Sequence, residues 1–386
     1  MFLQIHTLTA YPASLLNRDD AGLAKRIPFG NAQRLRVSSQ CLKRHWRDSL
    51  AAQLPELPDG QRTRSFFTRT VMPKAIAAGV PPALASSLIE PLAKAVIKGG
   101  VKEGGDLNQP VLLGLREGDY FVEMLRAASL EADPLKALTD RLQTKEEKGN
   151  LQAMSKASAG LTATLFGRMV TSDLLARVDA PVHVAHAFTV HAAQTEMDYF
   201  TVVDDLNRDD ETGAAHANQT ELGAGVYYGY VVVDVPLLVS NLAGCQAKDW
   251  HSAEPHAAHK VLQALIEAIL RQSPGAKLGS TAPYAHADFV LLEAGRTQPR
   301  ALSNAFLDEV RPKAGVDLRQ AALQRLSDYV GRLDAMYSSA DTSRFAASAL
   351  DLPAGLPSAQ TVPVAVQAAL DAIWAQQAQQ AGTSAP

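Results

Sequence analysis

Residues 14–47 read SLLNRDDAGLAKRIPFGNAQRLRVSSQCLKRHWR, and this basic segment joins a predicted strand to a predicted helix. The segment holds eight Lys and Arg residues against two acids, Asp19 and Asp20, so its formal charge is +6. The whole chain carries −3, and the residues after Arg47 together carry −9. A basic patch on an otherwise acidic chain indicates a polyanionic partner bound at one place, and nucleic acid fits this description.

The composition of the 386-residue chain is that of a globular protein. Its two cysteines, Cys41 and Cys245, lie far apart without a CxxC pair, so no disulfide framework or cysteine zinc site is expected. There is no signal-peptide pattern and no apolar run long enough to span a bilayer, which predicts a cytoplasmic protein without a membrane partner. The histidine pairs lack a third ligand and no Walker A string is present, so we expect no metal and no cofactor.

Hydrophobic patterns predict an alternation of strands and helices. A helix opens at Ser38-Ser39-Gln40, because serine is a preferred N-cap and Leu42, Trp46 and Leu50 follow at helical spacing. The other expected elements are strands at 2–9, 182–190, 226–235 and 287–292, a helix from about 255 to 272, and helices at 301–312 and 317–337. A helix-rich insert (55–181) and a polar insert (about 192–225) separate the strands, and the tail from 375 is expected to be frayed.

Without the inserts, the order of elements is β-α-β-β-α-β, so we predict an α+β fold with a ferredoxin-like, or RRM-like, core. Sheets of the RRM type are a common platform for single-stranded RNA. The same fold also carries unrelated functions, so the order of elements alone does not identify the ligand.

Seven strings, taken in chain order, resemble the CasC family, the crRNA-binding backbone subunit of the type I-E CRISPR Cascade complex. They are LNRDD (16–20), RLRVSSQCLKR (34–44), GRMVTS (167–172), VAHAFTVH (184–191), DYFTVVDDL (198–206), GAGVYY (223–228) and SNAF (303–306). The resemblance implies an RRM-like palm (1–54, 182–192 and 226–300), a helical finger insert (55–181) and a thumb hairpin (193–225). A helical C-terminal appendage and tail (301–386) would follow the palm.

The resemblance further implies a non-catalytic subunit of which several copies assemble along one crRNA. Its other partners would be the remaining Cascade subunits and a target DNA strand that pairs with the guide, so that base pairing reads the sequence and protein reads the shape. Two alternatives stay open from the residues alone: a metal-dependent ribonuclease, and a monomeric RRM-type RNA-binding module.

The start of the predicted helix is the first candidate RNA-binding site, since a helix N-terminus and nearby cations suit a phosphate. Lys43 and Arg47 lie four residues apart and should share a helical face. Loop cations before the helix, including Arg34 and Arg36, would follow the RNA backbone without reading its sequence. The candidate residues here are Arg18, Lys25, Ser38, Ser39, Gln40, Lys43, Arg44 and Arg47. The alternative is a capped surface helix with solvated cations.

Two further features leave two interpretations each. Asp19 and Asp20 could hold a catalytic metal, but capping their loop or orienting Arg18 is the preferred interpretation. Met169 matches a family position where an apolar side chain wedges against the nucleic acid, although methionine often only fills a core, and its neighbour Arg168 could reach a phosphate.

The thumb adds the last candidates. Tyr199 and Phe200 would stack on bases or dock on protein, and Leu222 on the opposite arm of the hairpin could act as a second apolar wedge.

Overall fold

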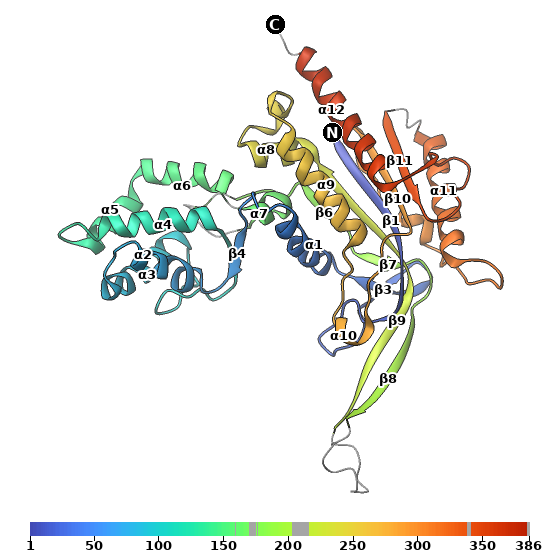
Figure 1. The fold of residues 1–386 in the computed structure, drawn as a ribbon, viewed down its shortest axis with the longest axis horizontal. Coiled ribbons are helices and arrows are strands. Elements are labelled where there is room, and N and C mark those ends of the chain that lie inside the picture. The colour runs from blue at the N-terminus through green and yellow to red at the C-terminus, as the bar shows by residue number, and fades with distance from the viewer. Residues whose placement is uncertain (159, 170–174, 176, 203–215, 338–340, 384–386) are drawn as a thin grey trace. The chain divides into compact units, whose positions relative to one another are not determined.

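The computed structural model describes residues 1–158, 160–169, 175, 177–202, 216–337 and 341–383 (Figure 1). The chain forms two compact units. Unit 1 consists of Met1–Leu50, Val184–Val233 and His259–Gln379, and unit 2 consists mainly of Ala51–His183 and Asp234–Ala258. The fold is α+β, as the order of elements predicted.

A mainly antiparallel sheet is the centre of unit 1. Its strands follow one another in space as β12-β11-β10-β1-β9-β7-β3-β2, while β6 and β8 each pair with β9. The strands are β1 (Phe2–Ser14), β2 (Arg26–Phe29), β3 (Ala32–Val37), β6 (Val182–Val184), β7 (Ala187–Thr189), β8 (Gln194–Val202), β9 (His216–Asp234), β10 (Phe289–Gly295), β11 (Thr342–Ser348) and β12 (Ala359–Gln360).

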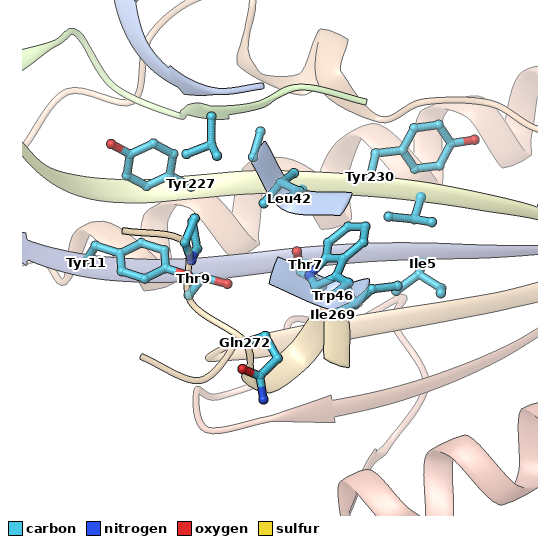
Figure 2. A pocket seen from close by; sticks show the side chains of 15 residues that line it. Ile5, Thr7, Thr9, Tyr11, Leu42, Trp46, Tyr227, Tyr230, Ile269 and Gln272 are labelled. Atoms are coloured by element: carbon cyan, nitrogen blue, oxygen red, sulfur yellow. The ribbon is translucent and has the colours of Figure 1, made fainter. Parts of the chain in front are cut away.

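Helices α1 (Ser39–Gln53) and α9 (His256–Arg271) cover one face of this sheet. Their side chains, including Trp46 and Ile269, meet Ile5 and Tyr227 around a small cavity of about 40 Å³ (Figure 2). Strands β1 and β9 approach closely here, since a Cβ on Gly229 would lie 2.5 Å from the Thr7 hydroxyl. The cavity has room for a few water molecules and none for a nucleotide.

The opposite face of the sheet is covered by the 3-10 turn η3 (Ser303–Phe306) and helix α11 (Leu318–Tyr337). Phe306 and Leu326 belong to a buried cluster with Leu8, Tyr228 and Leu291. A base could not stack on this face, because the C-terminal part of the chain already occupies it. The face that RRM-type sheets offer to RNA is therefore closed here.

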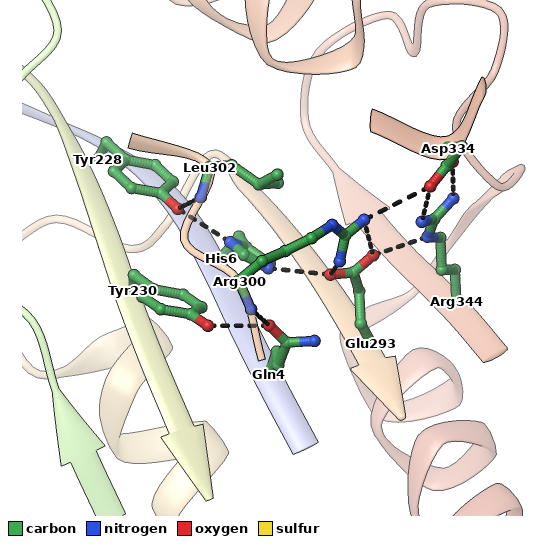
Figure 3. A network of polar contacts seen from close by, with 9 residues as sticks. All are labelled: Gln4, His6, Tyr228, Tyr230, Glu293, Arg300, Leu302, Asp334 and Arg344. Carbon is green, nitrogen blue, oxygen red and sulfur yellow. Dashed lines mark hydrogen bonds and ion pairs between the residues drawn. The ribbon is translucent and has the colours of Figure 1, made fainter. Parts of the chain in front are cut away.

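A buried polar network ties the C-terminal part of unit 1 to the sheet (Figure 3). Glu293 has no solvent exposure and accepts hydrogen bonds from Arg300 at 2.8 Å and Arg344 at 2.7 Å. His6 Nε2 lies 3.2 Å from the same carboxylate, and His6 Nδ1 lies 2.9 Å from the Tyr228 hydroxyl. Asp334 of α11 holds the other side of Arg344 at 2.6 Å. The carboxylate of Glu293 thus joins β1, β10 and β11.

Burial lowers the pKa of His6, although the Glu293 carboxylate opposes this shift, so His6 is neutral in the folded protein at neutral pH. Burial alone would raise the pKa of Glu293, but His6 and Arg300 together hold that pKa well below its usual range. Burial also lowers the pKa of His191, whose Nε2 accepts a hydrogen bond from Val226 N–H at 3.2 Å.

These shifts predict that the protein loses stability as the pH falls. Unfolding lets His6 and His191 bind protons below about pH 6.5, so each can lower the free energy of unfolding by up to about 1.4 kcal/mol per pH unit. Glu293 adds a loss of the same sign below about pH 4.5. Denaturant titrations between about pH 7.5 and about pH 5.5 should show this slope, and His6→Gln should reduce it. An equal slope in wild type and variant would contradict the assignment to His6.

Unit 2 is built from helices around its own apolar core, which includes Phe66, Phe67, Leu92 and Phe121. Strands β4 (Gly60–Thr63) and β5 (Val111–Gly114) form a separate two-stranded sheet. The helical elements are a π-helical turn η1 (Phe67–Val71), α2 (Met72–Ala77), α3 (Pro82–Val96), α4 (Leu115–Ala128), α5 (Pro134–Gln143), α6 (Lys145–Ser158), α7 (Leu161–Phe166), α8 (Val235–Ala243) and the 3-10 turn η2 (Ala247–Ser252). No helix within the described ranges is long and apolar enough to cross a membrane.

Three predicted elements agree closely with the structure. The helix expected after Ser38 is α1, with Trp46 and Leu50 buried as its apolar spacing requires. The helix expected from about 255 to 272 is α9, and the one expected at 317–337 is α11. These segments carry strong helical periodicity and local start signals, which do not depend on distant contacts.

Other predictions were wrong in detail. The strand expected at 182–190 is interrupted between β6 and β7, at Ala185 and His186. The segment expected as a basic loop contains the β2–β3 hairpin. The helix expected at 301–312 is only the turn η3, because tertiary contacts take up its backbone: Leu302 N–H donates to the Tyr228 hydroxyl at 3.0 Å and Val310 N–H to Val190 O at 2.9 Å.

The C-terminal appendage was expected to be helical with a frayed tail from residue 375. It is helical over α11 and over Val362–Thr383, but it also contains a strand, and the expected frayed tail is helical through Thr383. Strand β11 pairs with β10 along its whole length, from Thr342 to Ser348, and so extends the sheet. Helix α12 (Val362–Thr383) continues through most of the predicted tail (Figure 1). Trp374 Nε1 donates to His259 Nδ1 at 2.9 Å, and Gln377 is 5% exposed, so packing supports this helix.

Candidate nucleic-acid interface

The two serines at the start of α1 take part in the fold. The Ser38 hydroxyl accepts a hydrogen bond from Cys41 N–H at 3.4 Å, so Ser38 caps the helix as its residue type predicts. Its own N–H donates to Asn17 Oδ1 at 2.9 Å, which fastens the helix start to the preceding loop. Ser38 and Ser39 are 7% and 8% exposed, whereas Gln40 is exposed. Any ligand at this helix start would therefore meet Gln40 before the serines.

The cations of α1 lie along its accessible side. Arg44 is exposed, and Lys43 and Arg47 are half-buried. Burial lowers the pKa of the Lys43 ammonium, and the nearby charge of Arg47 lowers it further, which places these two side chains near each other. The predicted sharing of one helical face is thus consistent with their electrostatic coupling.

The loop of residues 17–25 lies against this helix start. Asp19 Oδ1 accepts hydrogen bonds from Ala21 N–H at 3.0 Å and Leu23 N–H at 2.9 Å, so its carboxylate caps the loop. Burial raises the pKa of the Cys41 thiol, while the charges of Lys25 and Arg44 oppose that shift. Arg18 and Asp20 are exposed on the loop.

Arg34 of the β2–β3 hairpin serves the fold, which corrects the expectation that it follows a phosphate backbone. Arg34 is fully buried and donates to Thr189 O at 3.2 Å and Phe306 O at 2.9 Å. Arg26 is paired with Glu221 of β9. The basic segment is therefore less cationic at the surface than its sequence indicates.

Strands β8 and β9 form the two-stranded hairpin that the sequence analysis termed the thumb (Figure 1). Tyr199 is 60% exposed and Phe200 is 36% exposed. As consecutive strand residues they point to opposite faces of the hairpin, so they cannot stack on the same base. The Lys277 ammonium lies 4.9 Å from the centre of the Phe200 ring, so Phe200 docks in part on the protein, whereas Tyr199 is more open. The end of the hairpin, residues 203–215, lies outside the described residues.

Leu222 is not an exposed wedge in this structure. It lies opposite Glu196 in the hairpin, is half-buried, and packs against a cluster that contains Leu16, Leu35 and Tyr227. Its apolar side chain stabilises the base of the hairpin through this packing.

In unit 2, the neighbours Arg168 and Met169 have opposite environments. Arg168 is 3% exposed, and its Nη1 contacts both carboxylate oxygens of Glu117 at 2.8 and 2.7 Å. We therefore withdraw Arg168 from the RNA-binding set, because its charge is buried and paired. Met169 is 87% exposed, so it is not a core filler. Arg168 also pairs through its backbone with Val178, which fixes the chain just before Met169.

A catalytic metal would need a cluster of acidic, histidine or cysteine side chains. Within the part of the chain that the structure describes, no group of three or more His, Cys, Asp or Glu side chains is arranged to hold a metal ion. In unit 1, the exposed and half-buried cations of α1 and of the loop before it could bind an anion. This cationic surface comprises Arg18, Lys25, Lys43, Arg44 and Arg47.

Two acids, one in each unit, pair with arginines discussed above and were not identified from the sequence. Glu117 is 51 residues from its partner Arg168, and Glu221 is 195 residues from Arg26. No local pattern links such residues. A capping-box position was the one available signal, since Glu117 accepts a hydrogen bond from Gly114 N–H at 2.8 Å at the start of α4.

A helix-flanked sheet with a long hairpin and a loop-and-helix cationic surface defines a class of α+β protein suited to binding a polyanion. Comparison of the sequence with family models then identifies the particular family. The chain belongs to the CT1975-like protein family (Cas_CT1975), whose model matches residues 3–373. A comparison with curated proteins gives no match.

Two solved structures are similar to the chain over almost its full length. One is a chain of a "CRISPR RNA-guided surveillance complex, pre-nicking", with a TM-score of 0.75 and 25% identity, covering 97% of this chain and 100% of that one. The second is a chain of a "CRISPR RNA-guided surveillance complex", with a TM-score of 0.61 and 23% identity, covering 96% and 99%. The second likeness concerns the fold alone.

Proposed function

We propose that this chain is a non-catalytic, crRNA-binding backbone subunit of a type I-E CRISPR Cascade complex, similar to CasC. The observation that carries the proposal is the end-to-end similarity to a chain of an RNA-guided surveillance complex, at 25% identity and a TM-score of 0.75. Membership of the CT1975-like family over residues 3–373 supports it. Several copies would line one guide RNA in the cytoplasm, beside other Cascade subunits, and leave the guide bases free to pair with target DNA.

The topology of unit 1 supports an RRM-like palm. The neighbour order β10-β1-β9-β7 is the one expected for a β-α-β-β-α-β core, with α1 and α9 as its two helices. Since α11 and η3 cover the other face, the guide would bind at the helix start and loop instead of across the sheet. This feature also disfavours the RRM-type module that stacks RNA on its open sheet.

The cationic surface supports a grip on the guide backbone. Phosphate contacts by Lys and Arg give affinity without sequence information, which suits a subunit whose guides differ in sequence. The hairpin β8–β9 and most of the helical unit 2 would serve as thumb and finger, with Tyr199 and Met169 as their exposed apolar contacts.

The test is one binding reaction analysed on two gels. End-labelled, guide-length RNA with repeat-derived ends is titrated with protein in magnesium and divided between native and denaturing gels. We expect intact RNA in a high-mass, salt-sensitive species. RNA cut at regular intervals, and left intact by Asp20→Asn, would replace the proposal with a ribonuclease. A single small complex whose mass does not grow with protein would indicate a monomeric module.

Lys43→Ala should weaken guide binding to the same degree for unrelated guide sequences. Loss of one phosphate contact should also reduce the slope of log affinity against log salt by about one. Filter binding at several salt concentrations measures both effects. Arg332→Ala, which removes an exposed cation of α11, is the matched control and should change neither. Equal effects of the two substitutions would show that Lys43 contributes general charge instead of a contact.

A further inference from the structure

His186 lies at a break in the sheet of unit 1, beside the start of α1. Strands β3 and β7 pair antiparallel with Val37 opposite Ala187, so His186, the residue before β7, is at the level of the helix cap Ser38. Irregularities in a sheet often redirect a side chain next to a functional site, and the sheet is interrupted here between β6 and β7. His186 is exposed, and it has no role in the proposed function.

Arg36 of β3 sets the protonation state of the His186 ring. Arg36 Nη1 lies 3.0 Å from His186 Nδ1. A guanidinium group can only donate hydrogen bonds, so Nδ1 accepts, and the imidazole is neutral with its proton on Nε2. Within the described part of the chain, Arg36 is the hydrogen-bond partner of this ring, so the Nε2–H of His186 is open to a ligand.

The charged groups that act on His186 are both cations, Arg36 and Lys25 of the loop before β2. Tyr230 of the neighbouring strand β9 donates its hydroxyl to Gln4 at 2.8 Å, so its hydroxyl is not directed at His186. Burial lowers the pKa of the His186 imidazole, and the charges of Arg36 and Lys25 lower it further. The free protein therefore holds a neutral histidine beside two cations at neutral pH.

These groups border the cationic surface. Arg36 N–H donates to Lys25 O at 2.8 Å, and Lys25 N–H donates to Asn17 O at 2.9 Å. Asn17 Oδ1 in turn accepts a hydrogen bond from Ser38 N–H at the start of α1, where residues 38–40 carry no titratable group. A phosphate bound between the loop and the helix start would therefore meet Lys25, Arg36 and His186 together.

We propose that His186 is a proton-linked phosphate contact of the guide-binding surface. A bound phosphate would draw a second proton onto the ring, at Nδ1, and this proton would displace the hydrogen bond from Arg36. The imidazolium and the released Arg36 Nη1 would then both donate to the phosphate. The inference rests on the proposed function and adds to it that the grip on the guide strengthens as the pH falls.

The sign of the effect follows from the pKa of His186 in the free and bound states. This pKa lies below 6.5 in the free protein, and a bound phosphate would raise it. Between the two values the complex binds more protons than the free protein, so guide affinity rises there as the pH falls, by up to about tenfold per pH unit for each subunit. Above the higher value and below the lower one, affinity does not depend on the protonation of His186.

Calorimetric titration of full-length protein with guide-length RNA, in two buffers of different ionisation enthalpy, tests the proposal. The difference in heat counts the protons that are bound, and at about pH 6.5 we expect net uptake by the wild type. His186→Gln should reduce this uptake by up to about one proton for each bound subunit. The same variant should flatten the dependence of affinity on pH in filter binding. Because His186 is exposed, the substitution should leave the fold intact, which circular dichroism checks.

Two further histidine variants make the assignment specific. His45 of α1 is half-buried next to Arg44 and has its own lowered pKa, caused first by burial, so His45→Gln removes its contribution and should leave the share of His186. His256→Gln replaces an exposed histidine of α9 and should keep the uptake of the wild type. Equal uptake in wild type and His186→Gln, with RNA bound by both, would overturn this inference alone. Wild-type protein that binds no RNA at any pH would overturn the proposed function and the inference with it.

Discussion

Glu293→Ala should lower the free energy of unfolding of unit 1 by about 3–5 kcal/mol. The substitution leaves the guanidinium groups of Arg300 and Arg344 without the carboxylate that they now contact at 2.8 and 2.7 Å. His6 loses its acceptor as well, and all of these groups meet where Glu293 has no solvent exposure. Removing one partner from a buried charge network is costly because the remaining charges stay desolvated.

Denaturant unfolding, followed by hydrogen exchange in peptides of β10 and β11, measures this loss. Asp371→Ala is the control, because Asp371 is an exposed acid of α12 and should change stability by no more than about 0.5 kcal/mol. Glu293→Gln should fall between the two, since it keeps the shape and two acceptor lone pairs but loses the charge. A loss in Glu293→Ala no larger than that of the control would show that the network does not hold β11 on the sheet.

Glu117→Ala should have the second large effect, confined to unit 2, with a loss of about 3–5 kcal/mol. Arg168 would remain buried without the carboxylate that now accepts its Nη1 at 2.7 Å. The N-terminus of α4 would also lose the hydrogen bond from Gly114 N–H to Glu117. Exchange of the α4 amides reports this loss directly, and the β10 amides serve as an internal reference.

The same helix supplies the matched control for Glu117. Asp119→Ala removes an acid that pairs with Lys74 at the surface, where the Lys74 side chain is 45% exposed and the Asp119 side chain 62%. This substitution should lower the free energy of unfolding by only about 0–1 kcal/mol. Replacing both Glu117 and Arg168 with apolar residues, Glu117→Leu and Arg168→Met, should recover much of the loss, since no unpaired charge remains. Equal exchange in Glu117→Ala and Asp119→Ala would contradict a structural role for the buried pair.

Local signals predicted the parts of the fold whose causes lie within a few residues. Ser38 caps α1 through the N–H of Cys41, three residues away, and the apolar spacing of Trp46 and Leu50 sets the buried face of that helix. The strands that form the centre of unit 1 were likewise visible as apolar runs, including the one that begins at Phe2. The helical tail was not predicted, because it is supported by a distant contact: Trp374 donates a hydrogen bond to His259, 115 residues away in the sequence.

The candidate site also combines features that the sequence predicted with features that it did not. The basic run at residues 14–47 and the family-like strings around Met169 and Tyr199 were visible in the sequence. The sequence did not show which of the cations are exposed to solvent. Arg34 and Lys43 belong to the same basic segment, yet Lys43 is half-buried and Arg34 is fully buried. Arg34 donates hydrogen bonds to the carbonyl oxygens of Thr189 and Phe306, which lie 155 and 272 residues away in the sequence.

The amino-acid sequence alone was sufficient for the α+β order of elements, the capped start of α1 and the sign of charge near it, because each depends on residue types at short spacing. Tertiary structure decided that β11 extends the sheet, that α11 closes its second face, and that Arg168 is buried while Met169 is exposed. The physical reason is that the free energy of a charge or an apolar side chain depends on whether it is desolvated and paired. Those conditions are set by partners that the chain brings together only when it folds.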